Sequence, residues 1–152
     1  MVVKLVRSTS LYIKQVMLEK GEANPYSIYK GLKAIKLKAG SYVNIRRYFN
    51  MLKHLHLIEF SRAEKSPTRV FDKHFYKIIQ ENVNSYAWKR PQIIMFPESM
   101  YGGAYYKKRL EEAQKEGITL RELALKRHPQ IAKLRQELLT KPINNQVSRD
   151  VV

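Results

Sequence analysis

The chain has 152 residues, of which 29 are lysine or arginine and 13 are aspartate or glutamate, so its formal net charge at neutral pH is +16. A folded chain with this charge repels itself and usually has a polyanionic partner, either nucleic acid or a membrane surface. The longest purely apolar run, Ile93 to Phe96, is far too short to span a bilayer, and the absence of cysteine excludes disulfides, thiolate catalysis and cysteine-bound zinc.

The first helix is predicted from about residue 8 to Lys20. Ser8, Thr9 or Ser10 can cap its start, because short polar side chains accept hydrogen bonds from the free backbone N–H groups there, and Gly21 can stop it. Its apolar side chains predict a broad buried stripe made of Leu11, Tyr12, Ile13, Val16, Met17 and Leu18.

A second helix is predicted to begin with Asn24 as its cap. Pro25 follows at the first helical position, where its missing N–H costs nothing. Apolar residues then recur at helical spacing, at Ile28, Leu32 and Ile35.

The third helix is predicted from Ser41 to about Leu55, after a break at Gly40. We expect its inward face to consist of Tyr42, Ile45, Phe49 and Leu52. His56 stands where the chain must adopt a left-handed conformation to leave the helix, and histidine tolerates that conformation better than most residues. Residues 57–62 and 70–79 then alternate in the manner of two strands, joined by a turn at residues 64–67.

This order of elements resembles winged helix-turn-helix domains of archaeal and bacterial type. The stretch Ser41-Tyr-Val-Asn-Ile-Arg-Arg-Tyr-Phe-Asn-Met-Leu-Lys-His-Leu-His-Leu-Ile-Glu carries most of the likeness, which covers about half of the chain. It departs from the family at His56, where a glycine is usual. The resemblance implies a winged domain over residues 1–80, with the third helix in a nucleic-acid groove and the hairpin as the wing.

The resemblance also implies a set of contact residues. Ser41, Asn44, Arg46 and Arg47 lie on the outward face of the third helix, where arginine and asparagine can bind base edges. Lysines suit phosphate, and four of them lie on the second helix and its exit: Lys30, Lys33, Lys36 and Lys38. The predicted wing contacts are Arg62, Lys65 and Arg69.

Residues 81–106 are rich in aromatic residues and proline, and we predict an extended strap that packs on the domain or on its partner. Lys89 and Arg90 are further candidate nucleic-acid contacts in this segment. Trp88 and the neighbouring tyrosines could stack on unpaired RNA bases, or they could pin the strap to the core of the domain.

Residues 107–142 are predicted to form C-terminal helices, and residues 143–152 a flexible tail. The helices carry apolar stripes made of Leu120, Leu123, Ala124, Ile131, Leu134 and Leu138. These stripes could form a homodimer or fold back on the domain. The predicted fold class is therefore mostly α, with a small β-hairpin wing and a C-terminal helical extension.

The sequence offers no catalytic motif. Its four histidines lie at no metal-ligand spacing, and Gly-rich phosphate loops and nucleophile elbows are absent. We therefore expect that the protein is not an enzyme and that it binds no cofactor or metal.

The positive charge is concentrated in the first half of the chain. Residues 1–80 contain 16 basic and 5 acidic residues, a net charge of +11. We predict a cytoplasmic regulator of transcription that binds duplex DNA and has no membrane partner. The composition also fits a thermophile. The alternatives are an RNA-binding component of a ribonucleoprotein, such as a ribosomal protein, and a winged-helix module for protein interaction.

Overall fold

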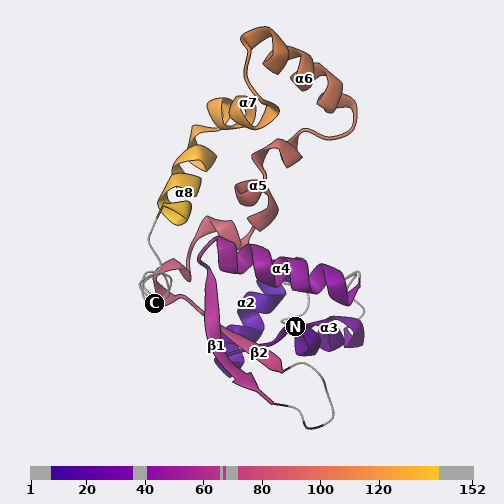
Figure 1. Cartoon of the computed structure of the whole chain (residues 1–152), viewed down its shortest axis with the longest axis vertical. Coiled ribbons are helices and arrows are strands. Elements are labelled where there is room, and N and C mark those ends of the chain that lie inside the picture. Colours follow the sequence, from indigo (N-terminus) through magenta and orange to yellow (C-terminus); the bar gives the residue numbers. More distant parts are fainter. Residues whose placement is uncertain (1–7, 36–40, 66, 68–71, 141–152) are drawn as a thin grey trace. The chain divides into compact units, whose positions relative to one another are not determined.

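The computed structural model describes residues 8–35, 41–65, 67 and 72–140 (Figure 1). These residues are mostly α-helical and include one two-stranded antiparallel sheet, so the predicted fold class is confirmed. The chain divides into two compact units, residues 1–89 and residues 90–152. None of the described helices is long and apolar enough to cross a bilayer.

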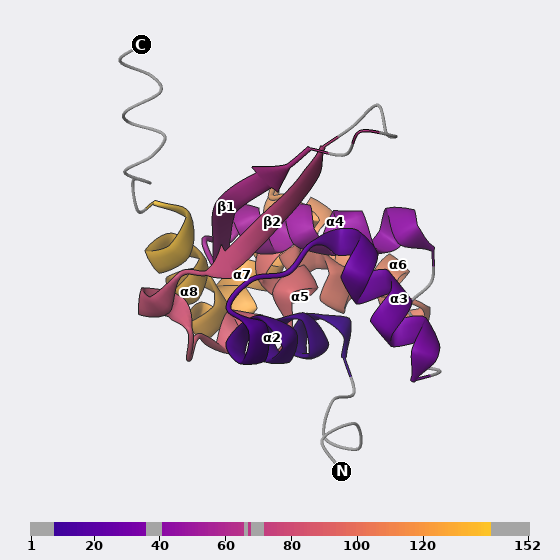
Figure 2. The ribbon, with the colours of Figure 1, turned by 90° about the horizontal axis from the view of Figure 1, so that it is seen from below.

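The described residues of the first unit form three α-helices, the two strands and two short 3-10 helices. In chain order these are α2 (Thr9–Lys20), α3 (Pro25–Ala34), α4 (Tyr42–His54), β1 (Ile58–Glu64), β2 (Lys73–Ile78), η1 (Gln80–Asn82) and η2 (Tyr86–Trp88). Helix α2 contacts α4 and β2, while α4 contacts α3 and β1 (Figures 1 and 2). This arrangement of helices followed by a hairpin is compatible with a winged helix.

Side-chain caps fix the starts of the three α-helices. The side-chain oxygens of Ser8, Asn24 and Ser41 accept hydrogen bonds from backbone N–H groups three residues later, at 3.2, 3.0 and 3.2 Å. Gly21 ends α2 in the left-handed conformation, with φ of 83°. The predicted starts of these helices are therefore confirmed.

The core of the first unit lies where α2, α4 and the hairpin meet. Its buried side chains include Ile13, Met17, Ile28, Leu32, Ile45, Phe49, Leu52, Leu55, Leu57, Ile58 and Ile78. The broad stripe predicted for α2 is wrong at Leu18, which is 57% exposed. Because successive helical residues point about 100° apart, Met17 can face the core while Leu18 faces outward. Tyr42 was predicted to face inward, but it is only partly covered.

The hairpin leaves α4 through His56, whose φ of 60° confirms the predicted left-handed conformation. Strands β1 and β2 pair from Ile58 opposite Ile78 to Glu64 opposite Lys73, with an irregularity between Phe60 and Arg62. Ala23, between α2 and α3, extends this sheet: it exchanges two backbone hydrogen bonds with Tyr76, at 2.8 and 2.9 Å. Strand β2 is therefore hydrogen-bonded along both edges, to β1 on one side and to Ala23 on the other.

The second unit consists of short helices. They are α5 (Pro91–Met95), η3 (Pro97–Met100), α6 (Ala104–Glu116), α7 (Leu120–Arg127) and α8 (Pro129–Leu139). A capping box formed by Thr119 and Glu122 fixes the start of α7. The predicted extended strap is wrong, because residues 81–106 form η1, η2, α5 and η3 instead. Pro91 and Pro97 each occupy a first helical position, where proline favours the start of a helix.

Candidate nucleic-acid interface

One side of α4 is buried and the other is open to solvent. Ile45, Phe49 and Leu52 are buried, at the spacing that places them on one face of a helix. Arg46, Arg47, Asn50 and Lys53 are exposed on the rest of its surface, and Val43 is 54% exposed near the start of the helix. The buried residues therefore hold α4 in place, and its exposed polar side chains Arg46, Arg47, Asn50 and Lys53 can contact a partner.

Helix α3 adds two lysines that rest on tyrosine rings. The Lys30 Nζ lies 5.5 Å from the centroid of the Tyr26 ring, and the Lys33 Nζ lies 5.2 Å from that of Tyr29. Both rings meet Tyr42, at the start of α4, edge to face with centroids 6.0 and 5.9 Å apart. These three rings, the tyrosine cluster, connect α3 to α4 and hold the two lysine stems beside them.

Together, α3 and α4 form a surface that carries only positive charge. We call their five exposed basic residues the basic face: Lys30, Lys33, Arg46, Arg47 and Lys53. Neither helix contains an aspartate or a glutamate. No carboxylate among the described residues forms an ion pair with any of the five. The described carboxylates of the first unit lie instead on α2, its exit, the hairpin and η1.

At the start of α4, two predicted contact residues take part in the cap of the helix. Ser41 is exposed, and its Oγ accepts the hydrogen bond from the backbone N–H of Asn44. The Ser41 hydroxyl can still donate its own hydrogen to a phosphate or a base edge. Asn44 is partly covered.

The hairpin contributes less free charge than predicted, because Arg62 is held within the unit. Its Nε donates to Glu22 at 2.7 Å, and its guanidinium also pairs with Glu64 at 3.1 Å. The guanidinium lies 4.1 Å from the centroid of the Phe75 ring. The hydrogen bond from Arg62 lowers the pKa of the Glu22 carboxyl, and the same bond raises the pKa of Arg62. Lys65 is exposed at the end of β1.

Trp88 belongs to the core, so the predicted alternative of base stacking is wrong for this ring. Its side chain is 1% exposed, and its Nε1–H donates to the backbone oxygen of Asn82 at 3.2 Å. The Ser10 hydroxyl donates to the Trp88 backbone oxygen at 2.8 Å, which fixes η2 against α2. Lys89 and Arg90 are exposed, but they fall in different units.

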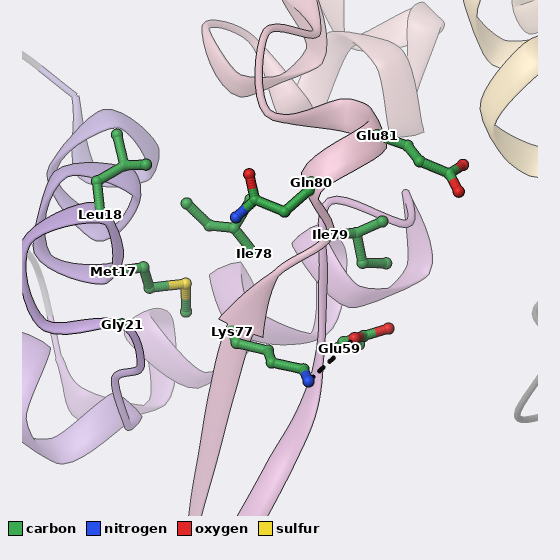
Figure 3. Close-up of a pocket in the computed structure, with 9 residues that line it drawn as sticks. All are labelled: Met17, Leu18, Gly21, Glu59, Lys77, Ile78, Ile79, Gln80 and Glu81. Carbon is green, nitrogen blue, oxygen red and sulfur yellow. Dashed lines mark ion pairs between the residues drawn. The ribbon is translucent and has the colours of Figure 1, made fainter.

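A hollow of about 530 Å³ lies elsewhere in the first unit, at the end of α2 and beside β2 and η1 (Figure 3). Met17, Leu18 and Ile78 line it with apolar atoms, and a Lys77–Glu59 ion pair of 3.6 Å is at its border. None of the predicted contact residues lines this hollow. Within the described part of the chain, no group of three or more histidine, aspartate or glutamate side chains could hold a metal ion.

The structure brings six predicted residues together on two adjoining helices: Lys30, Lys33, Ser41, Asn44, Arg46 and Arg47. Lys36, Lys38 and Arg69 lie outside the described residues. Lys53 was not among the predicted contacts, although the helical period indicates it, since it lies seven residues, or two turns, after Arg46. Comparisons with protein-family models, with curated proteins and with solved structures found no match.

Proposed function

We propose that the first unit is a winged helix that binds duplex DNA through the basic face, and that the chain is a non-enzymatic regulator of transcription. One observation carries this proposal: two packed helices present five exposed basic residues without a single carboxylate. Like charges gathered in this way cost free energy in the isolated protein, and a polyanion removes that cost when it binds.

The two helices have different tasks in this proposal. Arg46 and Arg47 project from α4, which enters the major groove, and an arginine there can donate two hydrogen bonds to guanine. Lys30 and Lys33 on α3 contact phosphates and set the register of the protein on the duplex. Their ammonium groups are already held beside tyrosine rings, so binding orders them at a lower entropic cost.

Duplex DNA suits this surface better than duplex RNA does. The major groove of B-form DNA admits an α-helix, whereas that of A-form RNA is too deep and narrow for side chains to read. The buried position of Trp88 also removes the one tryptophan that could have stacked on looped RNA bases.

The test measures the affinity of the whole chain for a short random-sequence duplex over a series of salt concentrations. We expect log affinity to fall with log salt with a slope of about −0.9 for each phosphate neutralised. Replacing both Lys30 and Lys33, the proposed phosphate contacts, by alanine should reduce the slope by about two such steps. Lys126→Ala is the matched control, since Lys126 is paired with Glu116 in the second unit.

An affinity that ignores salt would contradict the proposal. Tighter binding to a structured RNA than to any duplex, under the same buffer, would favour the ribonucleoprotein alternative instead.

A further inference from the structure

Two neighbouring tyrosines in the first turn of α6 are open to solvent. Tyr105 is 63% exposed and Tyr106 is 50% exposed, and neither has a ring or cation partner among the described residues. The other two aromatic rings of the second unit do have partners: the Arg121 guanidinium lies 5.9 Å from the Phe96 ring, and that of Arg109 lies 5.8 Å from the Tyr101 ring. Two rings of the second unit therefore pack against arginine side chains, and the other two have no such contact among the described residues.

The next two residues are exposed lysines that form no ion pair. Lys107 and Lys108 follow the tyrosines directly, and no described carboxylate pairs with either. Glu111 is exposed one turn later, but it too forms no ion pair within the described part of the chain. Other carboxylates of the unit already have arginine or lysine partners, namely Glu98, Glu112 and Glu116. The charge of the two lysines thus remains available to an outside anion.

The helix places rings and charges so that one strand of nucleic acid can meet both. Tyr105 and Lys108 are three residues apart, so they share a face of α6. Tyr106 points about 100° away from Tyr105, which offers a second ring to the next base. Gly102 and Gly103 precede the tyrosines, and nothing lies within 4 Å of where their side chains would be. The backbone before the two tyrosines is therefore open to solvent.

We propose that Tyr105, Tyr106 and Lys108, which we call the Tyr–Lys patch, form a binding site for single-stranded nucleic acid, while Lys107 lies about 200° around α6 from Tyr105. Flat rings stack on unpaired bases of any sequence, and an adjacent lysine neutralises a phosphate between those bases. A duplex keeps its bases stacked on one another, so it gains little from such rings. The site is separate from the basic face, and the chain would hold duplex and single strand with different units.

The test measures the affinity of the full chain for three probes, a short oligothymidine, the matching oligouridine and a random-sequence duplex. Buffer alone serves as the blank. Tyr105→Ala combined with Tyr106→Ala should weaken binding to the single strands by at least about tenfold, because each stacked base is lost. The duplex affinity should stay within about twofold of that of the unchanged chain. Tyr105→Phe combined with Tyr106→Phe keeps both rings and should restore single-strand binding.

A crossed control separates this site from the proposed function. Arg46→Ala combined with Arg47→Ala should weaken duplex binding and leave single-strand binding intact, whichever of oligothymidine and oligouridine binds better. The Tyr–Lys patch is disproved if the alanine pair leaves single-strand affinity unchanged, if the unchanged chain binds neither single strand, or if duplex affinity falls in parallel. It is also disproved if the alanine pair converts a dimer to a monomer in light scattering, because the rings would then cover a second copy.

Discussion

In the first unit, α3 and α4 present five exposed basic residues and no carboxylate, whereas the second unit mixes its charges along the chain. There Arg121 pairs with Glu98, Lys126 with Glu116, and both Arg109 and Arg127 with Glu112. The pairs Arg121–Glu98 and Lys126–Glu116 join residues of different helices. Ion pairs therefore link helices of the second unit, whereas the basic residues of α3 and α4 have no carboxylate partner among the described residues.

The difference has a physical consequence. A paired arginine contributes little to the attraction of a distant anion, because the adjacent carboxylate of opposite charge cancels most of its field. Unpaired cations on one surface add their fields and raise the local concentration of a polyanion. The first unit therefore differs from the second in its larger net charge and also in having two helices, α3 and α4, that carry basic residues without any carboxylate.

The largest effect that we predict concerns the core that holds the basic face in place. Phe49 is 3% exposed, and its ring lies 5.6 Å from that of Tyr76 on β2. Phe49→Ala should lower the free energy of unfolding by about 3–5 kcal/mol, because it leaves a cavity between α4 and the hairpin. Thermal melts followed by circular dichroism measure this change.

The neighbouring residue supplies the control. Asn50 is exposed on α4 and Asn50→Ala should change the free energy of unfolding by no more than about 0.5 kcal/mol. Equal melting shifts for the two variants would mean that Phe49 is not on the buried side of α4. The exposed side of α4, which carries part of the basic face, would then also differ.

The second prediction compares one arginine from each unit. Arg47→Ala should cost about 1–3 kcal/mol of binding free energy on a preferred duplex and flatten the preference at one position. It should leave the melting temperature almost unchanged, since Arg47 has no ion pair among the described residues. Binding isotherms on a set of duplexes, together with melts, check both parts.

Arg121→Ala should give the opposite result. Arg121 donates two hydrogen bonds of 2.7 Å to Glu98, so its loss should lower stability and leave duplex affinity unchanged. If Arg121→Ala weakened binding as much as Arg47→Ala did, ion pairing would not distinguish an arginine that contacts DNA from one that stabilises the fold.

Local signals in the sequence predicted much of the first unit. Ser8, Asn24 and Ser41 are short polar residues before helical patterns, and each is a cap in the structure. The left-handed His56 was also predicted from its place alone, at the point where a buried helix must turn into a strand. Such features depend on neighbours within a few residues, which the sequence displays directly.

Features that join distant residues could not be predicted. The Arg62–Glu22 ion pair and the bridge between Ala23 and Tyr76 join residues that are far apart in the sequence. Nothing in the pattern near Arg62 says that its charge is taken up by Glu22, so the sequence overstated the free charge of the hairpin. The burial of Trp88 likewise depends on α2, whose Ser10 bonds to it from 78 residues away.

The third prediction tests the paired charge of the second unit by pH. The hydrogen bonds from Arg121 hold the pKa of the Glu98 carboxyl below its ordinary value. A carboxyl with a lowered pKa in the folded state adds stability above its unfolded pKa, and this stability is lost as the pH falls through the folded pKa. Both side chains are partly exposed, so we expect the loss to be about 1 kcal/mol or less below roughly pH 4.

Urea unfolding at a series of acidic pH values measures this loss. Glu98→Gln should lower stability at neutral pH and remove part of its decline in acid. Glu111→Gln is the matched control, because Glu111 is exposed and forms no ion pair in the described part of the chain. A decline that is the same in Glu98→Gln as in the unchanged chain would show that this ion pair does not contribute.

The smallest effect that we predict is an absence of change at Trp88, where the first unit ends. This single tryptophan is buried and donates its Nε1–H to Asn82, so its fluorescence should be blue-shifted and resistant to acrylamide. Neither duplex DNA nor structured RNA should quench it, because neither reaches a ring enclosed by the core. The denatured chain gives the emission of a fully exposed tryptophan. Tyr86→Trp adds a partly exposed tryptophan for comparison, since Tyr86, two residues earlier, is 51% exposed. Quenching of the unchanged chain by RNA would mean that η2 opens on binding, and the proposal that the first unit binds duplex DNA would then need revision.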